Sequence, residues 1–458
     1  MISRAAGCRF AACSFFAACS FAHELETAGS PRMEFVVENG PHANLVYHAV
    51  CIAGKISCSR EAYAKLWQEK LVWSAGDERL MRAFGEAIDF QGAPVRGQYP
   101  FPPNYPAFYG DERRERGLIA ELFDAGDVTD AVHRARANAG RKRSAAIGAM
   151  LAAMKPRFDR WWNEEGERRS LGYARAIATT MGKHQLVELS ETIAGVMGFE
   201  WQGTQRLRFH VIAHAEADPR SVRATQIQRQ AVLEATTILS TEKYVSISLH
   251  ELFHYFYDAL PLERHVALMR QFEDSGEKFA GAYYTLFNEA MVSACAAIVD
   301  QRLMPGSYRS ESTNLNYFHP YIAPLARALF TIVPARVEAR RNLLDGIVPE
   351  YISRGRTELG PAADKLAFAM MARGVYGDGA LIERMAKALS DSSPAIGVFT
   401  NERKLLRHFE HVNSIRLAIR PGAPKAEQRA PTPKSVEIHF AAPDDAALDG
   451  LIRGFFAR

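Results

Sequence analysis

One segment, from Val245 to Leu260, restricts the fold more than any other part of this sequence of 458 residues. Apolar side chains recur through it at helical spacing, and Pro261 then removes a backbone N–H that a continuing helix would need. The segment therefore predicts a helix that is buried on most sides. It also carries two histidines and a glutamate. Burying such groups costs free energy unless they are paired or bind a metal.

His250, Glu251 and His254 determine what this helix can do chemically. Residues i and i+4 project from one helix face, one turn apart. Both imidazoles can therefore reach one zinc ion at about 2.0–2.1 Å. The carboxylate of Glu251 leans toward the same cleft without being a ligand, and it can take a proton from water and return it to a leaving group. This HExxH pattern is typical of metalloproteases.

A second apolar segment, from 287 to 294, contains Asn288 and Glu289. Together with HExxH, this Asn-Glu pair resembles the gluzincin branch of the zincin superfamily of metallopeptidases, in which a downstream helix supplies the third zinc ligand. The resemblance implies that His250, His254 and Glu289 hold one zinc ion per chain, with water in the fourth position. It further implies that Glu251 is the general base.

The resemblance covers about residues 205–330 and extends to the superfamily only. The Gly and His of the metzincin extension are replaced by Tyr257 and Leu260. The 34 residues between His254 and Glu289 form a longer gap than in thermolysin-like or aminopeptidase-like patterns. We therefore recognise no named family across the chain.

Several further side chains compete for roles at such a site. Asp258 either orients an imidazole or is a surface carboxylate near the helix end. Other candidate third ligands lie in a stretch rich in charge, where we expect a solvated surface: Glu263, His265, Glu273, Asp274 and Glu277.

Hydrolysis also needs a group that stabilises the developing oxyanion. The gluzincin resemblance supports Tyr317 and His319 as catalytic residues for this purpose, and Tyr321 as a third candidate. The alternative for all three is aromatic packing in a loop that leads into a helix. The strand expected at 231–237 precedes the HExxH helix, and in zincins an edge strand at this point binds extended substrate by strand addition.

Composition and charge exclude other classes of protein. Hydrophobic residues make up 48% and charged residues 24% of the chain, which is ordinary for globular proteins. A net charge of +4 is too small to indicate a nucleic-acid partner. The basic run from His133 to Arg143 is typical of a solvated helix face. Cys295 lies in an apolar run and is expected to be buried, and past residue 32 no apolar stretch is long enough to span a membrane.

We expect an α+β protein that is predominantly α-helical, with a zincin-like catalytic core that contains a small sheet and is flanked by helical regions. Strands are expected at 33–37, 207–215, 229–237 and 436–440. Further helices are expected at 362–373 and 381–389. The domains expected are a leader (1–32), a helical N-terminal region (33–200), a zincin-like core (201–345), a helical C-terminal region (346–419), and a Pro-rich linker with a short strand and helix (420–458).

These patterns predict a zinc-dependent metallohydrolase, in particular a peptidase that acts on a peptide or protein substrate. The alternative is a helical binding or scaffold protein in which HExxH is coincidental or inactive. The sequence leaves the oligomeric state and the cleavage specificity open.

The N-terminal segment has the layout of a secretory signal peptide. Arg4 and Arg9 precede an apolar stretch that ends in a small-x-small cleavage site at 20–22. The segment 16–19 also resembles a bacterial lipobox, with Phe where Leu is usual. We therefore expect export to the periplasm or the extracellular space, with a lipid anchor as one form. The alternative is a cytoplasmic protein that starts at Met33.

The export hypothesis makes a direct prediction about the mature chain. N-terminal sequencing of protein purified from its native host should find a first residue near His23, or a lipid-modified Cys19. A chain that begins at Met1 or Met33 would contradict both forms of the hypothesis.

Overall fold

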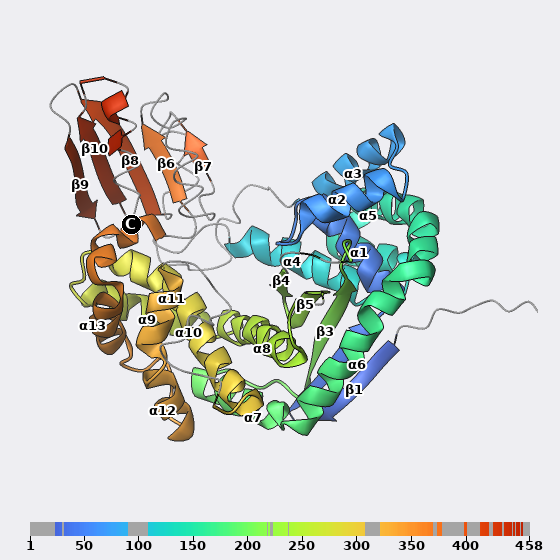
Figure 1. Ribbon diagram of the computed structural model, residues 1–458, viewed down its shortest axis with the longest axis horizontal. Helices are drawn as coiled ribbons and strands as arrows, with labels where there is room; N and C mark the ends of the chain where they lie inside the picture. The colour runs from blue at the N-terminus through green and yellow to red at the C-terminus, as the bar shows by residue number, and fades with distance from the viewer. Residues whose placement is uncertain are drawn as a thin grey trace, which may run out of the picture.

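The computed structural model describes residues 23–451, except 30–31, 90–108, 218, 220–222, 237, 307–320, 370–372, 378–397, 401–412, 421–424, 433–434, 442, 445 and 449. The protein is α+β and predominantly α-helical, as the sequence predicts. Its described strands form two separate five-stranded sheets, and helices surround the first of them (Figure 1).

The first sheet is mixed and has the strand order β1-β2-β3-β5-β4. The three central strands run parallel and the two outer strands are antiparallel to their neighbours. Strands β2, β3 and β5 confirm three of the predicted strands. Strand β2 comes before residue 200 and pairs with β3 after it, so the sheet unites segments from both sides of that position. The bounds are β1 (His23–Gly29), β2 (Met33–Asn39), β3 (Gln205–Ala213), β4 (Ala224–Ile227) and β5 (Gln230–Ala235).

Two expectations for this sheet were wrong. Residues 23–29 form β1, although the expected leader extends to residue 32. The strand predicted to lie at the edge, β5, lies inside the sheet, and β4 is the last described strand in the order. All six residues of β5 are buried, which is typical of an interior strand. The sequence of β4 is only four residues long and half polar, so its pattern gave no signal.

The two faces of the sheet bury two separate hydrophobic cores. Along β3, Leu207, Phe209 and Val211 face one core and Ile212 faces the other, as the two-residue period of a strand requires. Helices from the N-terminal region cover the second face: α1 (Pro41–Ile52), α2 (Arg60–Glu69), α3 (Ala75–Ile88), α4 (Tyr109–Phe123) and α5 (Val128–Trp161).

The first face is covered by the helices on which the HExxH segment and the Asn-Glu pair lie. Helix α8 (Thr241–Asp258) packs against α10 (Ala280–Leu303), β4 and β5. In Figure 1, α8 lies between the sheet and the helices of the second half of the chain. The other helices whose buried residues belong to this core are α6 (Glu167–Lys183), α7 (Leu186–Met197), α9 (Leu262–Asp274), α11 (Ile322–Leu329), α12 (Ile332–Glu338) and α13 (Val348–Leu359).

The C-terminal part contains more strand than the sequence predicts. Its sheet has the order β7-β6-β8-β10-β9, and β10 confirms the predicted terminal strand. The helix expected at 362–373 is a 3-10 helix (Gly360–Ala369) followed by β6, and the Pro-rich linker contains β9. Pro431 fits there because β9 is the last described strand in the order, and an outer strand tolerates a missing N–H. The helix expected at 381–389 lies outside the described residues. The strands are β6 (Arg373–Gly377), β7 (Val398–Thr400), β8 (Asn413–Arg420), β9 (Lys425–Thr432) and β10 (Ser435–Ala441).

The cysteines follow the sequence-based expectation only in part. Cys295 is buried and free, as expected. Cys51 at the end of α1 and Cys58 before α2 form a disulfide that the spacing did not reveal. Closing so short a loop stabilises the fold by about 2–3 kcal/mol in the chain-entropy model.

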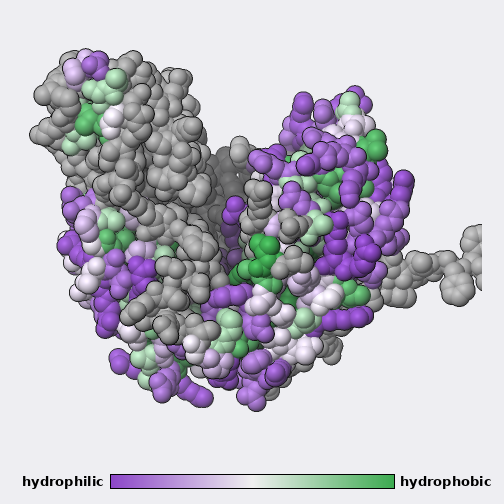
Figure 2. All heavy atoms as spheres, viewed as in Figure 1, coloured by the Kyte–Doolittle hydropathy of each residue, from purple (hydrophilic) through white to green (hydrophobic). Residues whose placement is uncertain are grey.

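Two further expectations, one about the basic run and one about membrane spans, agree with the structure. Most of the basic run on α5 is exposed, and Figure 2 shows hydrophilic residues on this side of the molecule. Within the described ranges, no helix combines the length and the apolar character needed to cross a membrane.

Two fully buried histidines predict how stability depends on pH. Burial lowers the pKa of both His48 and His210 to about 3. The unfolded chain, with a histidine pKa near 6.5, therefore binds more protons than the folded chain between these values. Their contribution to stability is complete above about pH 6.5 and is lost as the pH falls toward 3.

Nδ1 of His48 accepts from the Trp67 indole N–H at 3.1 Å. We predict that the substitution His48→Asn, whose amide oxygen can also accept from this N–H, flattens the pH dependence of stability. Between pH 7 and pH 5, wild type should lose about 2 kcal/mol more unfolding free energy than the variant. Urea unfolding at the two pH values measures the difference. Equal losses in the two proteins would show that His48 is not held neutral in the folded state.

Candidate metal centre

Helix α8 places His250 and His254 against α10. Its N-terminus is capped by the Ser240 side chain, which accepts from the Lys243 N–H at 3.4 Å. The Lys243 ammonium also donates to Asp300 of α10 at 2.9 Å and so ties the two helices together. Apolar side chains of α8 are buried on both sides of the histidines, so the helix cannot rotate without exposing them.

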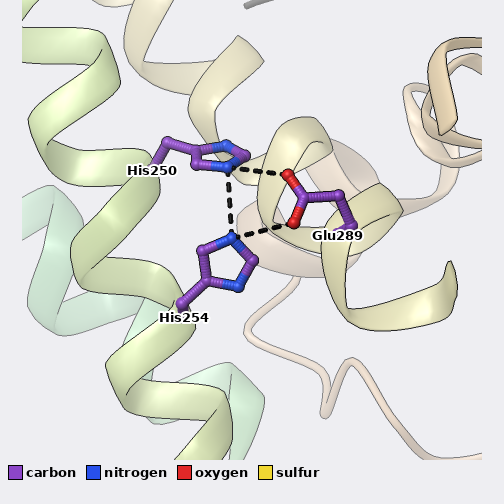
Figure 3. A group of neighbouring side chains, drawn as sticks. All are labelled: His250, His254 and Glu289. Atoms are coloured by element: carbon purple, nitrogen blue, oxygen red, sulfur yellow. Dashed lines mark hydrogen bonds and ion pairs between the residues drawn. The ribbon is translucent and has the colours of Figure 1, made fainter. Parts of the chain in front are cut away.

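The two imidazoles and one carboxylate meet between these helices. Nε2 of His250 lies 3.2 Å from Nε2 of His254 and 3.1 Å from Oε1 of Glu289. Nε2 of His254 lies 3.2 Å from Oε2 of Glu289 (Figure 3). The three side chains are only 7%, 15% and 11% exposed, in the order His250, His254, Glu289. The geometry thus brings together the three residues that the sequence predicts as metal ligands.

These separations fit a single metal ion. Ligand atoms at about 2.0–2.1 Å from a tetrahedral zinc lie about 3.3 Å from one another. The separations of 3.1–3.2 Å between the three side chains are close to that value. Two imidazoles and a carboxylate are also the donor set of catalytic zinc sites that keep one position open. The residues present therefore fit a zinc ion.

Asn288 orients one of the two imidazoles. Its side-chain oxygen lies 3.2 Å from Nδ1 of His254, so Nδ1 carries the proton and donates it to the amide oxygen. Nε2 of His254, which faces Glu289 and His250, is then the nitrogen left to bind a metal when its proton is displaced. This is the tautomer that a metal ligand requires, and the contact is of the kind that fixes a ligand's orientation.

The electrostatics of the group favour a positive charge between its members. Burial opposes protonation of His254, but Glu289 and Glu251 outweigh it and raise the pKa of His254 to about 9. Burial also opposes ionisation of Glu289, yet the two histidines hold the pKa of its carboxyl well below the usual range. Asp258 adds to the negative potential that raises the pKa of His254.

Glu251 lies beside the three ligand residues and is partly exposed. Burial raises the pKa of its carboxyl, and the charges of His250 and His254 partly offset that effect. A weaker positive influence comes from Arg116 of α4. The guanidinium of Arg116 also donates to the Gln226 side chain on β4 at 2.8 Å, so α4, β4 and α8 meet at this point.

The other sequence-based candidates have different outcomes. Tyr317 and His319 lie outside the described residues, and Tyr321 is buried among the residues of the first core. The expectation of a solvated stretch between the helices is wrong for two residues. His265 is buried against Tyr257, and Glu277 is buried in an ion pair with Arg356. His265 lies on α9 and Glu277 lies shortly after it. The charged residues on the exposed face of α9 made its buried face hard to recognise in the sequence. Glu263, Glu273 and Asp274 are exposed as expected.

Sequence reasoning missed two features of the site. The role of Asn288 toward His254 could have been inferred, since it adjoins a predicted ligand on the same helix. Arg116 could not, because its position depends on how α4 packs against β4, more than 100 residues away along the chain.

Comparisons with known proteins add no relative: no family model, no curated protein and no solved structure matches this chain.

We predict that Asn288→Ala weakens zinc binding about 10–100-fold, the usual effect of removing a group that orients a ligand. Competition titration with a chromophoric zinc chelator measures the dissociation constant. Asn138→Ala, at an exposed position on α5, serves as the matched control and should bind zinc like wild type. An unchanged affinity in Asn288→Ala would contradict the orienting role.

Proposed function

We propose that this chain is a zinc-dependent hydrolase that cleaves peptide bonds, with a zincin-like catalytic core. The convergence of His250, His254 and Glu289 within 3.2 Å contacts, with Glu251 next to them on α8, carries the proposal. A coincidental HExxH would not require a third ligand residue from another helix at the same point. The resemblance to gluzincins, which rests on the same residues, supports the proposal.

The ligand residues and Glu251 have separate tasks in this proposal. A zinc ion held by His250, His254 and Glu289 would act as a Lewis acid and lower the pKa of a water molecule. The Glu251 carboxylate accepts a proton from the attacking water and returns it to the amine that leaves. Burial of this carboxyl raises its pKa, which makes it a better base than an exposed glutamate.

Strand β4 is the candidate surface for an extended peptide, in place of β5. The Glu234 N–H donates to the Arg223 carbonyl at 3.1 Å, and hydrogen-bonded pairs alternate along an antiparallel ladder. With the observed register, the backbone groups of Ala224 and Gln226 therefore point away from β5. A peptide added there would lie beside α8, where main-chain hydrogen bonds would hold it.

Two further parts of the proposal come from the sequence. Tyr317 and His319 are proposed to stabilise the oxyanion because of the gluzincin resemblance. Export to the periplasm or the extracellular space is proposed from the N-terminal pattern. The Cys51–Cys58 disulfide supports export, because disulfides persist in oxidising compartments.

Two substitutions separate the base from the metal ligand. Glu251→Gln should leave zinc bound, because this residue is not a ligand, and should lower the hydrolysis rate about 10²–10⁴-fold. Glu289→Ala removes a ligand, so it should lose both zinc and activity, and activity should return in part at high added zinc. Zinc content by mass spectrometry and cleavage of a quenched fluorescent peptide library are measured on the same samples.

Glu263→Ala, at an exposed position on α9, is the matched control and should keep both zinc and activity. Full activity in Glu251→Gln would refute the proposed mechanism. Tight zinc binding in Glu289→Ala would place the third ligand elsewhere. Wild-type protein that neither binds zinc nor cleaves peptides would instead favour a helical binding or scaffold protein.

A further inference from the structure

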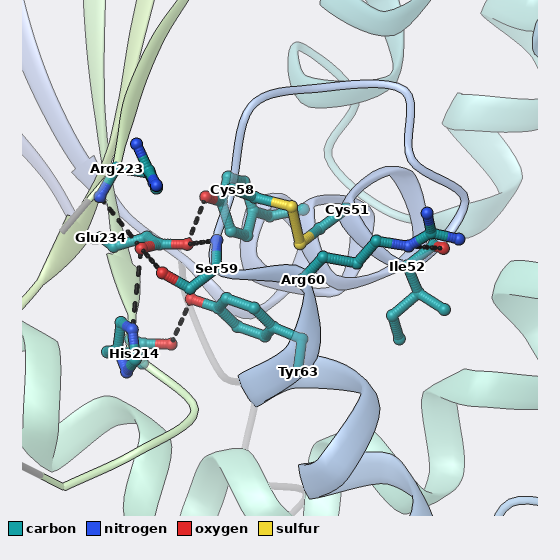
Figure 4. Close-up of a disulfide and its surroundings, with 11 residues drawn as sticks. Cys51, Ile52, Cys58, Ser59, Arg60, Tyr63, His214, Arg223 and Glu234 are labelled. Atoms are coloured by element: carbon teal, nitrogen blue, oxygen red, sulfur yellow. Dashed lines mark hydrogen bonds and ion pairs between the residues drawn. A yellow bond between two sulfur atoms is a disulfide. The ribbon is translucent and has the colours of Figure 1, made fainter. Parts of the chain in front are cut away.

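A fully buried carboxylate on β5, that of Glu234, collects donors from three separate segments (Figure 4). Its Oε1 accepts from the Tyr47 hydroxyl at 2.8 Å and from the Ser59 N–H at 2.8 Å. Its Oε2 accepts from the Ser59 hydroxyl at 2.7 Å and from the Arg223 N–H at 3.1 Å. Charge-assisted hydrogen bonds of this kind are stronger than neutral ones, so the position of each donor segment depends on Glu234.

The disulfide fixes one of these segments. Ser59, which provides two of the four donors, directly follows Cys58, and the Cys51–Cys58 bond attaches this point to the end of α1. The guanidinium of Arg60 donates to the Ile52 carbonyl at 3.0 Å and closes the loop a second time. Without the covalent bond, the chain between α1 and α2 would have more conformations in which Ser59 leaves Glu234.

The other end of this connection is the strand beside the metal centre. Arg223 immediately precedes β4, and it exchanges two hydrogen bonds with Glu234: its N–H donates to the carboxylate and its carbonyl accepts from the Glu234 N–H. Strand β4 has only four residues, so the two hydrogen bonds at Arg223 add to a short ladder with β5.

We propose that β4, the strand beside the metal centre, is better ordered when Cys51 and Cys58 form their disulfide than when they are reduced. The disulfide acts on β4 through Ser59 and Glu234. Cys58 is partly exposed, so a small dithiol can reach the bond. The dithiol supplies two electrons and two protons: the S–S bond breaks, two thiols form, and the dithiol closes to a cyclic disulfide. Ser59 then separates from Glu234, and the backbone hydrogen bonds of β4 break more often.

This inference rests on the proposed function only where it regards β4 as the peptide-binding strand. Its test needs neither zinc nor substrate, so it can fail while the proposed function holds, and the reverse. The readout is hydrogen–deuterium exchange of the amides at 223–227, of which those of Arg223, Thr225 and Ile227 face β5 or Glu234, in the full chain, oxidised or reduced with dithiothreitol. Amides of α10 serve as the internal reference.

Reduction should speed exchange at 223–227 about tenfold, the change expected when one hydrogen bond of ordinary net strength is lost, and should leave α10 unchanged. Ser59→Ala keeps the disulfide and should reproduce part of the increase. The double variant Cys51→Ser with Cys58→Ser should exchange fast from the start and not respond to dithiothreitol, which controls for the other cysteines.

Two results would overturn the proposal. One is equal exchange at 223–227 in the oxidised and reduced wild type. The other is an equal increase in α10, which would show that the disulfide stabilises the whole fold without a specific connection to β4. Both results come from wild-type protein reduced after folding, so they do not depend on whether the double variant folds.

Discussion

The electrostatic conflict between His250, His254 and Glu289 is the constraint on which the rest of the structure depends. Two imidazole nitrogens and a carboxylate face one another across 3.1–3.2 Å in a largely buried position. Such a group is unfavourable unless a positive charge lies among its members, whether protons or a metal ion. The apolar packing of α8 and α10 prevents the three side chains from moving apart. The folded protein therefore keeps them in an arrangement that a positive charge between them stabilises.

The first sheet and the helices on its two faces together hold His250, His254 and Glu289 in place. The first sheet is covered on both faces, and α8 and α10 lie on the face whose core contains most of the buried residues of the second half of the chain. The opposite face carries α1, α2 and the disulfide, and among the described residues these are connected to β4 through Ser59 and Glu234 of the sheet. Glu234 is the residue that links the two sides, because it lies on β5 and binds Ser59 and Arg223.

Much of the site could be predicted because its signals are local. His250 and His254 lie one turn apart in a segment with helical periodicity, and Glu289 lies in a second apolar segment, so each element could be recognised alone. Features that depend on non-local packing were not predicted. Strand β4 has too few residues for a pattern, the Cys51–Cys58 pair has no diagnostic spacing, and the Pro-rich segment that forms β9 resembles a linker by composition. Arg116 gains its position only from the packing of α4 on β4.

The most direct test of the metal centre is a crystal structure of the zinc-loaded protein with anomalous data collected at the zinc absorption edge. We predict one anomalous peak per chain, within about 2.0–2.1 Å of Nε2 of His250, Nε2 of His254 and a carboxylate oxygen of Glu289. A peak elsewhere, or none at this position in protein equilibrated with zinc, would contradict it.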